Sequence, residues 1–292
     1  MAGKLIIIWD YDSALGQINS TMPYNFDFKH IYEEIENVEY ILQKAKEKNI
    51  KMTFACLGFA AEESVYPFGN AAQIKKISGE GHEIASHSWR HEWFPYLTEK
   101  QIYRSLERSK QALEKCTGKV NSVNGFVPPH SRPMSWYKKY SVSLGDRAIY
   151  PFHKGGDTGY ILKQLSLLNY RWCRVLSSYK PVWKKIFRSD IKEEFLFGKW
   201  EINNDILCVP QHYTGFDEFA QKYLEKAVEK NEALVIVGHP AALSRNKSES
   251  SHNFNLFINI AEGYIAKNQL ETYTVTEYAD KYLKQGASKD QH

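Results

Sequence analysis

The first half of the chain alternates between two hydrophobic patterns. Residues 5–9 form a continuous apolar run, which predicts a short buried strand. In residues 28–48, apolar side chains recur every three or four positions with Glu and Lys between them, which predicts an amphipathic helix. Strands that alternate with helices in this way are typical of an α/β fold with a parallel sheet.

The same alternation continues to residue 129. The expected elements are strands at residues 51–57, 82–85 and 120–127 and a short helix at residues 71–78. Another helix is expected to begin after Thr98, a favoured N-cap residue, and to end near Cys116, because Gly118 is a typical helix terminator.

The second half is less regular. Residues 141–215 show no sustained period, so we expect loops and short strands there. The elements expected after this segment are a helix at residues 217–230, a strand at 233–237, a helix at 254–267 and a last strand and helix within 273–283. No internal repeat or interdomain linker interrupts the chain, and we therefore expect a single domain over residues 1–292.

The charge balance argues against a nucleic-acid partner. The 38 basic and 34 acidic residues are dispersed along the chain and give a net charge of +4, too mild for a nucleic-acid surface. One local exception is the basic and aromatic run at residues 180–192. A solvated helix face explains that run better than an anionic partner does.

Cysteine usage and the absence of long apolar runs indicate a cytoplasmic protein. The four cysteines are far apart and include no Cys-x-x-Cys pair, so unpaired thiols are expected. The apolar run near the N-terminus is too short for a signal-peptide core, and no run approaches the roughly 20 residues that a membrane span requires.

Two carboxylates follow the first predicted strand. Asp10 and Asp12 are two residues apart, so on a strand their side chains project from the same face. The carboxyl ends of barrel strands are where α/β enzymes collect catalytic groups. Turns also favour Asp, however, and this pair alone indicates a turn as readily as a site.

A histidine pair follows the predicted strand at residues 82–85. His87 and His91 have the i, i+4 spacing that stacks two imidazoles on one face if they open a helical turn. Neutral imidazoles suit zinc or a similar ion. A catalytic zinc site needs three protein ligands and an open position, and these histidines with one aspartate supply that number. The other aspartate would be free to act on a water molecule.

Two further segments end predicted strands. Paired prolines fix an extended segment that continues through Pro129, His130 and Arg132, and such a rigid loop can form a groove wall or present a backbone N–H. The apolar strand at residues 233–237 is followed by His239, which in a barrel would point to the same mouth and could act as a general acid.

Taken together, these segments and their order resemble the polysaccharide deacetylase family, also called the NodB-homology or carbohydrate esterase 4 group. Its motifs are an aspartate pair after the first strand, His-Ser/Thr-x-x-His, Arg-Pro-Pro-Tyr/Phe-Gly and a late apolar strand that ends in His. The resemblance implies a distorted (β/α) barrel with seven parallel strands as one catalytic domain. It also implies these roles: Asp10 as base, Asp12, His87 and His91 as metal ligands, His239 as acid, and Pro129, His130 and Arg132 at the substrate or oxyanion.

The sequence departs from the family pattern in two places. The Asp-x-Asp spacing resembles the imidase- and allantoinase-like branch, which leaves open which carboxylate binds the metal. Val127 stands where the family has the arginine that pairs with the base, and Arg132 is a candidate to compensate.

The expected function is a metal-dependent hydrolase that removes an acetyl group from an N-acetylated sugar or glycan precursor, with a place in surface-polysaccharide biosynthesis. A divalent metal is implied, with zinc favoured, and the expected partner is a small-molecule or oligosaccharide substrate. Two alternatives remain open. The Asp-x-Asp spacing suggests a cyclic amide or imide hydrolase, and Val127 suggests a non-catalytic glycan-binding relative.

Overall fold

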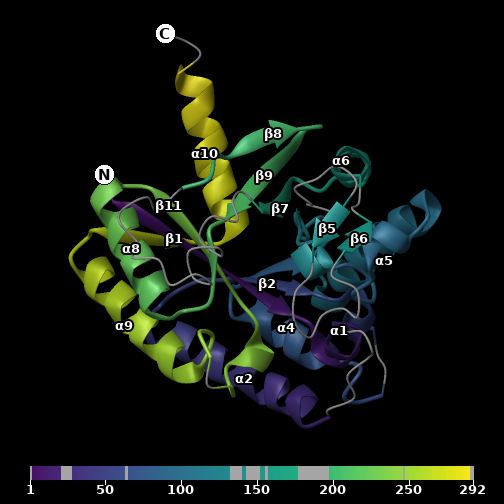
Figure 1. Cartoon of the computed structure of the whole chain (residues 1–292), viewed down its shortest axis with the longest axis horizontal. Helices are drawn as coiled ribbons and strands as arrows, with labels where there is room; N and C mark the ends of the chain where they lie inside the picture. Colours follow the sequence, from purple (N-terminus) through teal and green to yellow (C-terminus); the bar gives the residue numbers. More distant parts are fainter. Residues whose placement is uncertain are drawn as a thin grey trace.

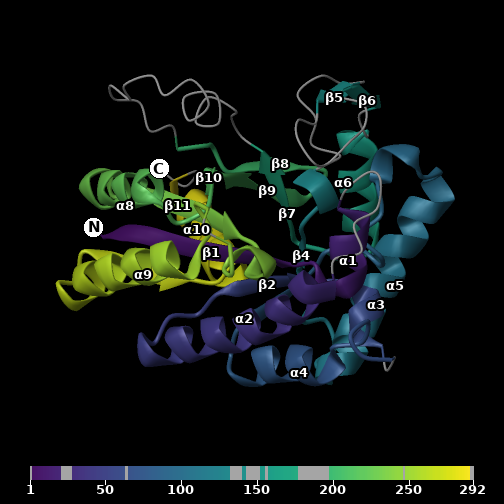
Figure 2. The same ribbon diagram turned by 60° about the horizontal axis from the view of Figure 1, so that its bottom comes forward.

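A curled, mostly parallel sheet forms the centre of the molecule (Figures 1 and 2). The computed structural model describes residues 2–20, 28–62, 65–131, 140–142, 152–154, 157–176, 197–245 and 247–289. Along the sheet the strands are β10 (Tyr213–Thr214), β11 (Ala233–Gly238), β1 (Gly3–Tyr11), β2 (Thr53–Cys56), β3 (Glu83–Ser86), β4 (Gly125–Phe126), β7 (Trp172–Leu176), β9 (Ile206–Gln211) and β8 (Glu201–Asn203).

All neighbours from β10 to β9 pair in parallel, and the edge strand β8 is antiparallel to β9. The strand β12 (Leu270–Tyr273) pairs with the first half of β1, and β2 pairs with the second half. A separate pair consists of β5 (Tyr140–Val142) and β6 (Phe152–Lys154).

Helices cover the outside of the curled sheet, as Figure 2 shows. They are α1 (Ser13–Asn19), α2 (Phe28–Glu47), α3 (Gly58–Ala61), α4 (Ala71–Gly79), α5 (Glu99–Thr117), α6 (Thr158–Leu167), α8 (Glu218–Lys230) and α9 (Ser251–Ala266), whereas α10 (Val275–Lys289) starts at the amino ends of the strands. The last helix projects beyond the rest of the molecule in Figure 1. Within the described ranges, no helix is long and apolar enough to cross a lipid bilayer.

The continuous apolar run in β1 is explained by burial on both faces. Leu5 and Ile7 belong to the outer core between sheet and helices, whereas Ile6 and Ile8 belong to a second cluster inside the curl. The inner cluster is Ile6, Ile8, Ala55, Ala85, Val127, Trp172, Leu207, Val209, Val235, Val237, Val275 and Ala279. Further along the strands, beyond this apolar cluster, the next inward-facing side chains therefore lie at the mouth of the barrel, where the carboxyl ends of the strands meet.

One bulky residue fills much of the inner layer. Trp172 is fully buried, and a Cβ atom added to Gly125 on the adjacent strand would lie 1.9 Å from its ring. Below it, the Trp172 indole and the Thr276 hydroxyl both donate to the carboxylate of Glu83, which fixes the start of α10 under the amino ends of the strands. The barrel is thus closed at the end opposite the mouth.

The fold class predicted from the sequence is confirmed. The helix from Thr98 has the expected boundaries, with a capping box between Thr98 and Gln101 and a left-handed Gly118 at its C-cap. The helices at residues 71–79 and 218–230 and the strand at 233–238 also agree with expectation.

Two details differ from the prediction. The strand expected at residues 120–127 shrinks to two residues, because the segment before it forms a turn in which Val120 is 83% exposed. The main path also contains eight parallel strands rather than seven.

The additional strands come from the aperiodic segment at residues 141–215, where α6, β7 and the β8–β9 hairpin were not expected individually. Asn204 and Asp205, with φ of 50° and 62°, form the two-residue turn of that hairpin. The basic run at 180–192 lies outside the described residues.

Candidate active site and metal centre

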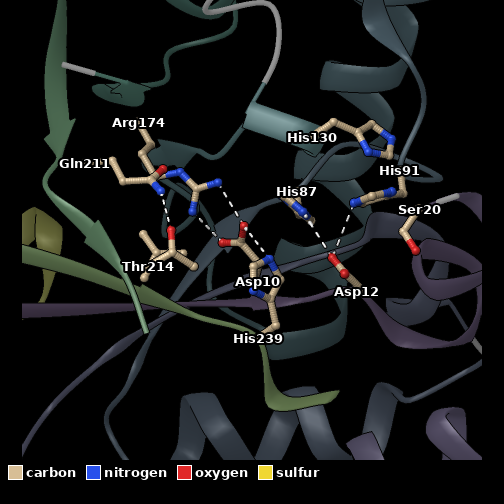
Figure 3. Close-up of a pocket in the computed structure, with 11 residues that line it drawn as sticks. Asp10, Asp12, Ser20, His87, His91, His130, Arg174, Gln211, Thr214 and His239 are labelled. Carbon is tan, nitrogen blue, oxygen red and sulfur yellow. Dashed lines mark hydrogen bonds and ion pairs between the residues drawn. The ribbon is translucent and has the colours of Figure 1, made fainter. Parts of the chain in front are cut away.

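A polar pocket opens at the carboxyl ends of the strands (Figure 3). Its lining comprises Asp10, Asp12, Ser20, His87, His91, His130, Arg174, Gln211, Thr214, Val237 and His239. Six of the eight site residues predicted from sequence are therefore brought together. Pro129 is buried outside this lining, and Arg132 lies outside the described residues.

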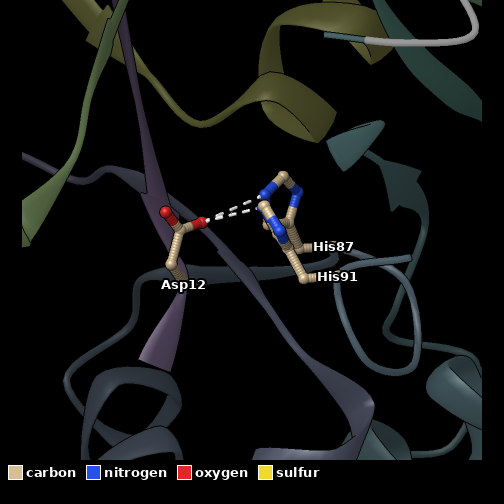
Figure 4. A group of neighbouring side chains, drawn as sticks. All are labelled: Asp12, His87 and His91. Atoms are coloured by element: carbon tan, nitrogen blue, oxygen red, sulfur yellow. Dashed lines mark ion pairs between the residues drawn. The ribbon is translucent and has the colours of Figure 1, made fainter. Parts of the chain in front are cut away.

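Asp12, His87 and His91 converge on one point (Figure 4). The Asp12 Oδ1 atom lies 3.3 Å from Nε2 of His87 and 3.3 Å from Nε2 of His91. One ligand atom from each residue lies within 4.8 Å of the others, and all three residues are buried. This is the number and kind of ligands that a catalytic divalent-metal site requires.

The hydrogen bonds of these residues fit a metal ion. His87 Nδ1 lies 2.7 Å from the carbonyl oxygen of Val127, which can only accept, so Nδ1 carries the proton and Nε2 presents its lone pair to Asp12. Burial lowers the pKa of His91 despite the nearby Asp12 carboxylate, which favours a neutral imidazole. Among the described residues, Asp12 Oδ1 has no hydrogen-bond donor. Lone pairs of one oxygen and two nitrogens thus face one another, which a cation between them would stabilise.

The backbone between the two histidines is a bend, so the predicted helical turn is wrong. Ser88 and His91 have φ of 72° and 59°, in the left-handed region, and no helix includes them. Their backbone N–H groups are held by hydroxyls of Ser86 and Ser88, at 3.3 Å and 3.0 Å. The bend nevertheless brings the two rings to a centroid distance of 5.0 Å on the side facing Asp12.

Asp10 is held by an arginine that the sequence analysis did not identify. Arg174 on β7 donates from Nη1 to Asp10 Oδ1 at 2.6 Å and from Nη2 to Oδ2 at 2.8 Å, a bidentate pair. Asp10 is 4% exposed and Arg174 is 2% exposed. Burial alone would raise the pKa of Asp10, but the guanidinium outweighs it and lowers the pKa below its usual value. Asp10 is therefore a fixed, ionised carboxylate.

His239 faces the same carboxylate from the end of β11. Its Nε2 lies 3.7 Å from Asp10 Oδ2, while its Nδ1 and backbone N–H both contact Glu249 Oε2, at 2.8 Å and 2.7 Å. Burial would lower the pKa of His239, but the Glu249 carboxylate outweighs burial and raises the pKa to about 9. The ring is therefore cationic at neutral pH and presents Nε2–H to the pocket.

His130 forms one wall beside the candidate metal ligands. The backbone of His130 has a φ of 57°. Its ring stacks on Trp93 at a centroid distance of 3.8 Å and meets the His91 ring edge-on at 4.4 Å. On the opposite side, Gln211 donates to the hydroxyl of Thr214 at 2.8 Å. Figure 3 shows Asp10 between these two sides, with Arg174 toward Gln211 and the metal ligands toward His130.

The two residues that anchor Asp10 and His239 were not predicted from the sequence, for different reasons. Arg174 is a lone charge in the otherwise apolar strand 172–176, a pattern that marks a buried, paired group and that sequence inspection could have found. Glu249 lies in the polar loop before α9, and nothing in its local sequence distinguishes it from a solvated side chain.

The fold agrees with the comparisons to known proteins. Residues 25–149 match the family described as "Polysaccharide deacetylase". A peptidoglycan-N-acetylglucosamine deacetylase of Bacillus cereus is 30% identical over 100 residues, which are 34% of this chain and 32% of that protein. The matched segment thus spans about a third of the length of this curated relative.

Two solved structures share the fold. A protein of Mycobacterium smegmatis, provisionally assigned as a polysaccharide deacetylase, aligns with a TM-score of 0.64 and 18% identity over 97% of this chain and 91% of its own. A carbohydrate esterase 4 pseudoenzyme of Bacillus anthracis aligns with a TM-score of 0.50 and 14% identity, over 94% and 65%. The fold is that of a carbohydrate esterase 4 type barrel. Residues 25–149 of the chain are similar to the polysaccharide deacetylase family.

Proposed function

We propose that the chain is a divalent-metal-dependent deacetylase acting on an N-acetylated amino sugar or a glycan precursor that contains one. The observation that carries the proposal is the Asp12, His87 and His91 cluster beside a separate carboxylate, Asp10, which Arg174 fixes in place. Two imidazole nitrogens and one carboxylate oxygen favour zinc among the common divalent metals.

A metal ion held by Asp12, His87 and His91 would act as the Lewis acid of the reaction. A zinc ion bound there would polarise an amide carbonyl and lower the pKa of a bound water from about 15.7 to roughly 7. Asp10, which is ionised and is not needed as a ligand, accepts the proton of the attacking water. Its bidentate pairing with Arg174 keeps the carboxylate from rotating toward the metal cluster.

His239 is suited to the opposite proton transfer. Glu249 holds Nδ1, so Nε2 carries the mobile proton on the side that faces the pocket. With a pKa raised to about 9, the imidazolium is present at neutral pH and protonates the departing amine nitrogen. The backbone N–H of His130 is proposed to donate to the oxyanion, a contribution of about 3 kcal/mol for a well-placed donor.

The substrate class follows from the relatives. The curated relative is a deacetylase of N-acetylglucosamine in peptidoglycan, and we carry over to this chain the N-acetylated amino sugar, as a free precursor or within a short glycan. Deacetylation is better supported than cyclic amide hydrolysis by that relative. The alternative of a non-catalytic glycan-binding relative was based on Val127, which stands where the family has an arginine. Because Arg174 pairs with Asp10 instead, that reason no longer applies.

The test is acetate release from N-acetylglucosamine, its oligomers and peptidoglycan fragments, with and without added zinc. We expect release that stops with a chelator and with Asp12→Asn. Asp205→Asn makes the same chemical change at an exposed hairpin turn and should retain full activity. If zinc-loaded protein opens cyclic amides or imides but releases no acetate from these substrates, the proposed reaction is wrong.

A further inference from the structure

The inside of the barrel offers two adjacent positions from which a guanidinium can approach Asp10. In the parallel pairing of β4 with β7, Phe126 is aligned with Cys173. The next residues along the two strands are Val127 and Arg174, and both are buried side chains of the inward-facing row. The position where the family motif has arginine is therefore a neighbour, one strand away, of the arginine that this chain uses.

We infer that Arg174 is the positioning residue for Asp10, and that the guanidinium has been relocated from strand β4 to strand β7 without a change in its task. The inference rests on the proposed function, in which Asp10 is the base. It adds a residue that none of the sequence motifs contains.

The space between the strands permits this relocation. Asp10 is aligned with Ala55 on β2, and Ala55 is aligned with Ala85 on β3. The next strand, β4, has Gly125 in the corresponding inward position, one residue before Phe126. The small residues in this row leave room for the Trp172 ring, and Arg174, two residues further along β7, reaches Asp10.

The chemistry of the pair explains why the arginine is needed. A carboxylate that is 4% exposed requires a partner, and both Asp10 oxygens are held by separate guanidinium nitrogens, which fixes the carboxylate plane as well as its charge. A lysine would give a single ammonium and could not hold both oxygens in this way. Val127 contributes only an apolar side chain and the carbonyl that orients His87.

The relocation is tested by moving the arginine back. The variants are Arg174→Val, the exchange Val127→Arg with Arg174→Val, and the matched control Arg171→Val, which removes an exposed arginine from the start of the same strand.

In Arg174→Val, loss of orientation should lower kcat by about 100-fold. Its bound metal should stay unchanged, and its KM should remain within about twofold of wild type, because the lost orientation affects turnover and not substrate binding. The exchange should recover at least tenfold of the lost kcat, and Arg171→Val should behave as wild type.

Urea denaturation of the variants tests this inference independently of the proposed reaction. Arg174→Val leaves the buried, ionised Asp10 without its bidentate partner and with only His239 at 3.7 Å, so the urea midpoint should fall at neutral pH and recover in the exchange variant. This readout needs no substrate, so it decides the case even if wild type releases no acetate. Should Arg174→Val fail to fold, adding Asp10→Asn removes the unpaired charge and should restore folding. An exchange variant no more stable and no more active than Arg174→Val would overturn the relocation, and an Arg174→Val enzyme with wild-type kcat would overturn the positioning role.

Discussion

His239 and Asp10 face each other across the pocket with a separation of 3.7 Å between Nε2 and Oδ2. Each is anchored from behind by a residue of opposite charge, Glu249 for the imidazole and Arg174 for the carboxylate. The two anchors shift the pKa values of the pair in opposite directions, so that the base is ionised and the acid is protonated over the same range of pH. In the proposed mechanism, the site is thereby prepared for both proton transfers before substrate binds.

Replacing Glu249 with Gln tests the anchor of the acid. An amide can still accept from the backbone N–H of His239, but the charge that raises the pKa of His239 to about 9 is removed. We expect the alkaline limb of the kcat/KM profile for acetate release to move down by at least one pH unit. Glu229→Gln, at an exposed site on α8, is the matched control. An alkaline limb that does not move would show that His239 is not the acid.

The same pair should appear in the pH dependence of stability. The folded-state pKa of His239 is raised, so its contribution is complete below the unfolded pKa of about 6.5 and is lost as pH rises through about 9. The difference in unfolding free energy between wild type and Glu249→Gln should decrease across this window by on the order of 1 to 3 kcal/mol. Urea denaturation at pH 6 and at pH 9.5 measures it. A difference that is constant with pH, or that increases toward alkaline pH, contradicts the assignment.

The two aspartates are assigned different tasks, and parallel Asn variants distinguish them. Asp10→Asn should bind metal as wild type does while its turnover falls by orders of magnitude, because it loses the proton acceptor and not a ligand. Asp12→Asn should lose the metal and the activity together. Elemental analysis of both purified variants, beside an acetate assay, is sufficient. Metal lost from Asp10→Asn and retained in Asp12→Asn would mean that the roles are exchanged.

Gly125 is expected to tolerate no side chain. A Cβ atom there would lie 1.9 Å from the Trp172 ring that fills the barrel interior, so Gly125→Ala should destabilise the fold by about 1 to 3 kcal/mol or more. Gly79→Ala is the control, because a Cβ in α4 meets no atom within 4 Å and should be neutral or slightly stabilising. The urea midpoints of the two variants measure the effect. Equal midpoints would argue against the close packing of Trp172.

The sequence was most informative where a hydrophobic pattern was strong. The apolar run after Gly3 and the amphipathic spacing in α2 were sufficient to predict β1 and α2, and with them the placement of Asp10 at a strand end, whereas α1 between them was not predicted. Local geometry was harder. The His87 and His91 spacing suggested a helical turn, but serine hydroxyls hold the backbone in a bend with positive φ, which no hydrophobic period reports.

Contacts between distant segments could not be predicted from one sequence. Arg174 meets Asp10 across the barrel, 164 residues away along the chain, and lies in a segment without regular period. Glu249 reaches back ten residues from a polar loop. Both anchors depend on how the strands curl, a property that side-chain patterns along a single strand do not contain.

The most direct test of the metal centre is anomalous X-ray diffraction at the zinc edge from crystals grown with zinc. The account predicts one strong peak bonded to an Asp12 oxygen and to Nε2 of both His87 and His91, at about 2.0 to 2.2 Å. Asp10 should remain paired with Arg174 and outside bonding distance of the ion. A peak liganded by Asp10 in place of Asp12, or one away from the two histidines, would contradict the account.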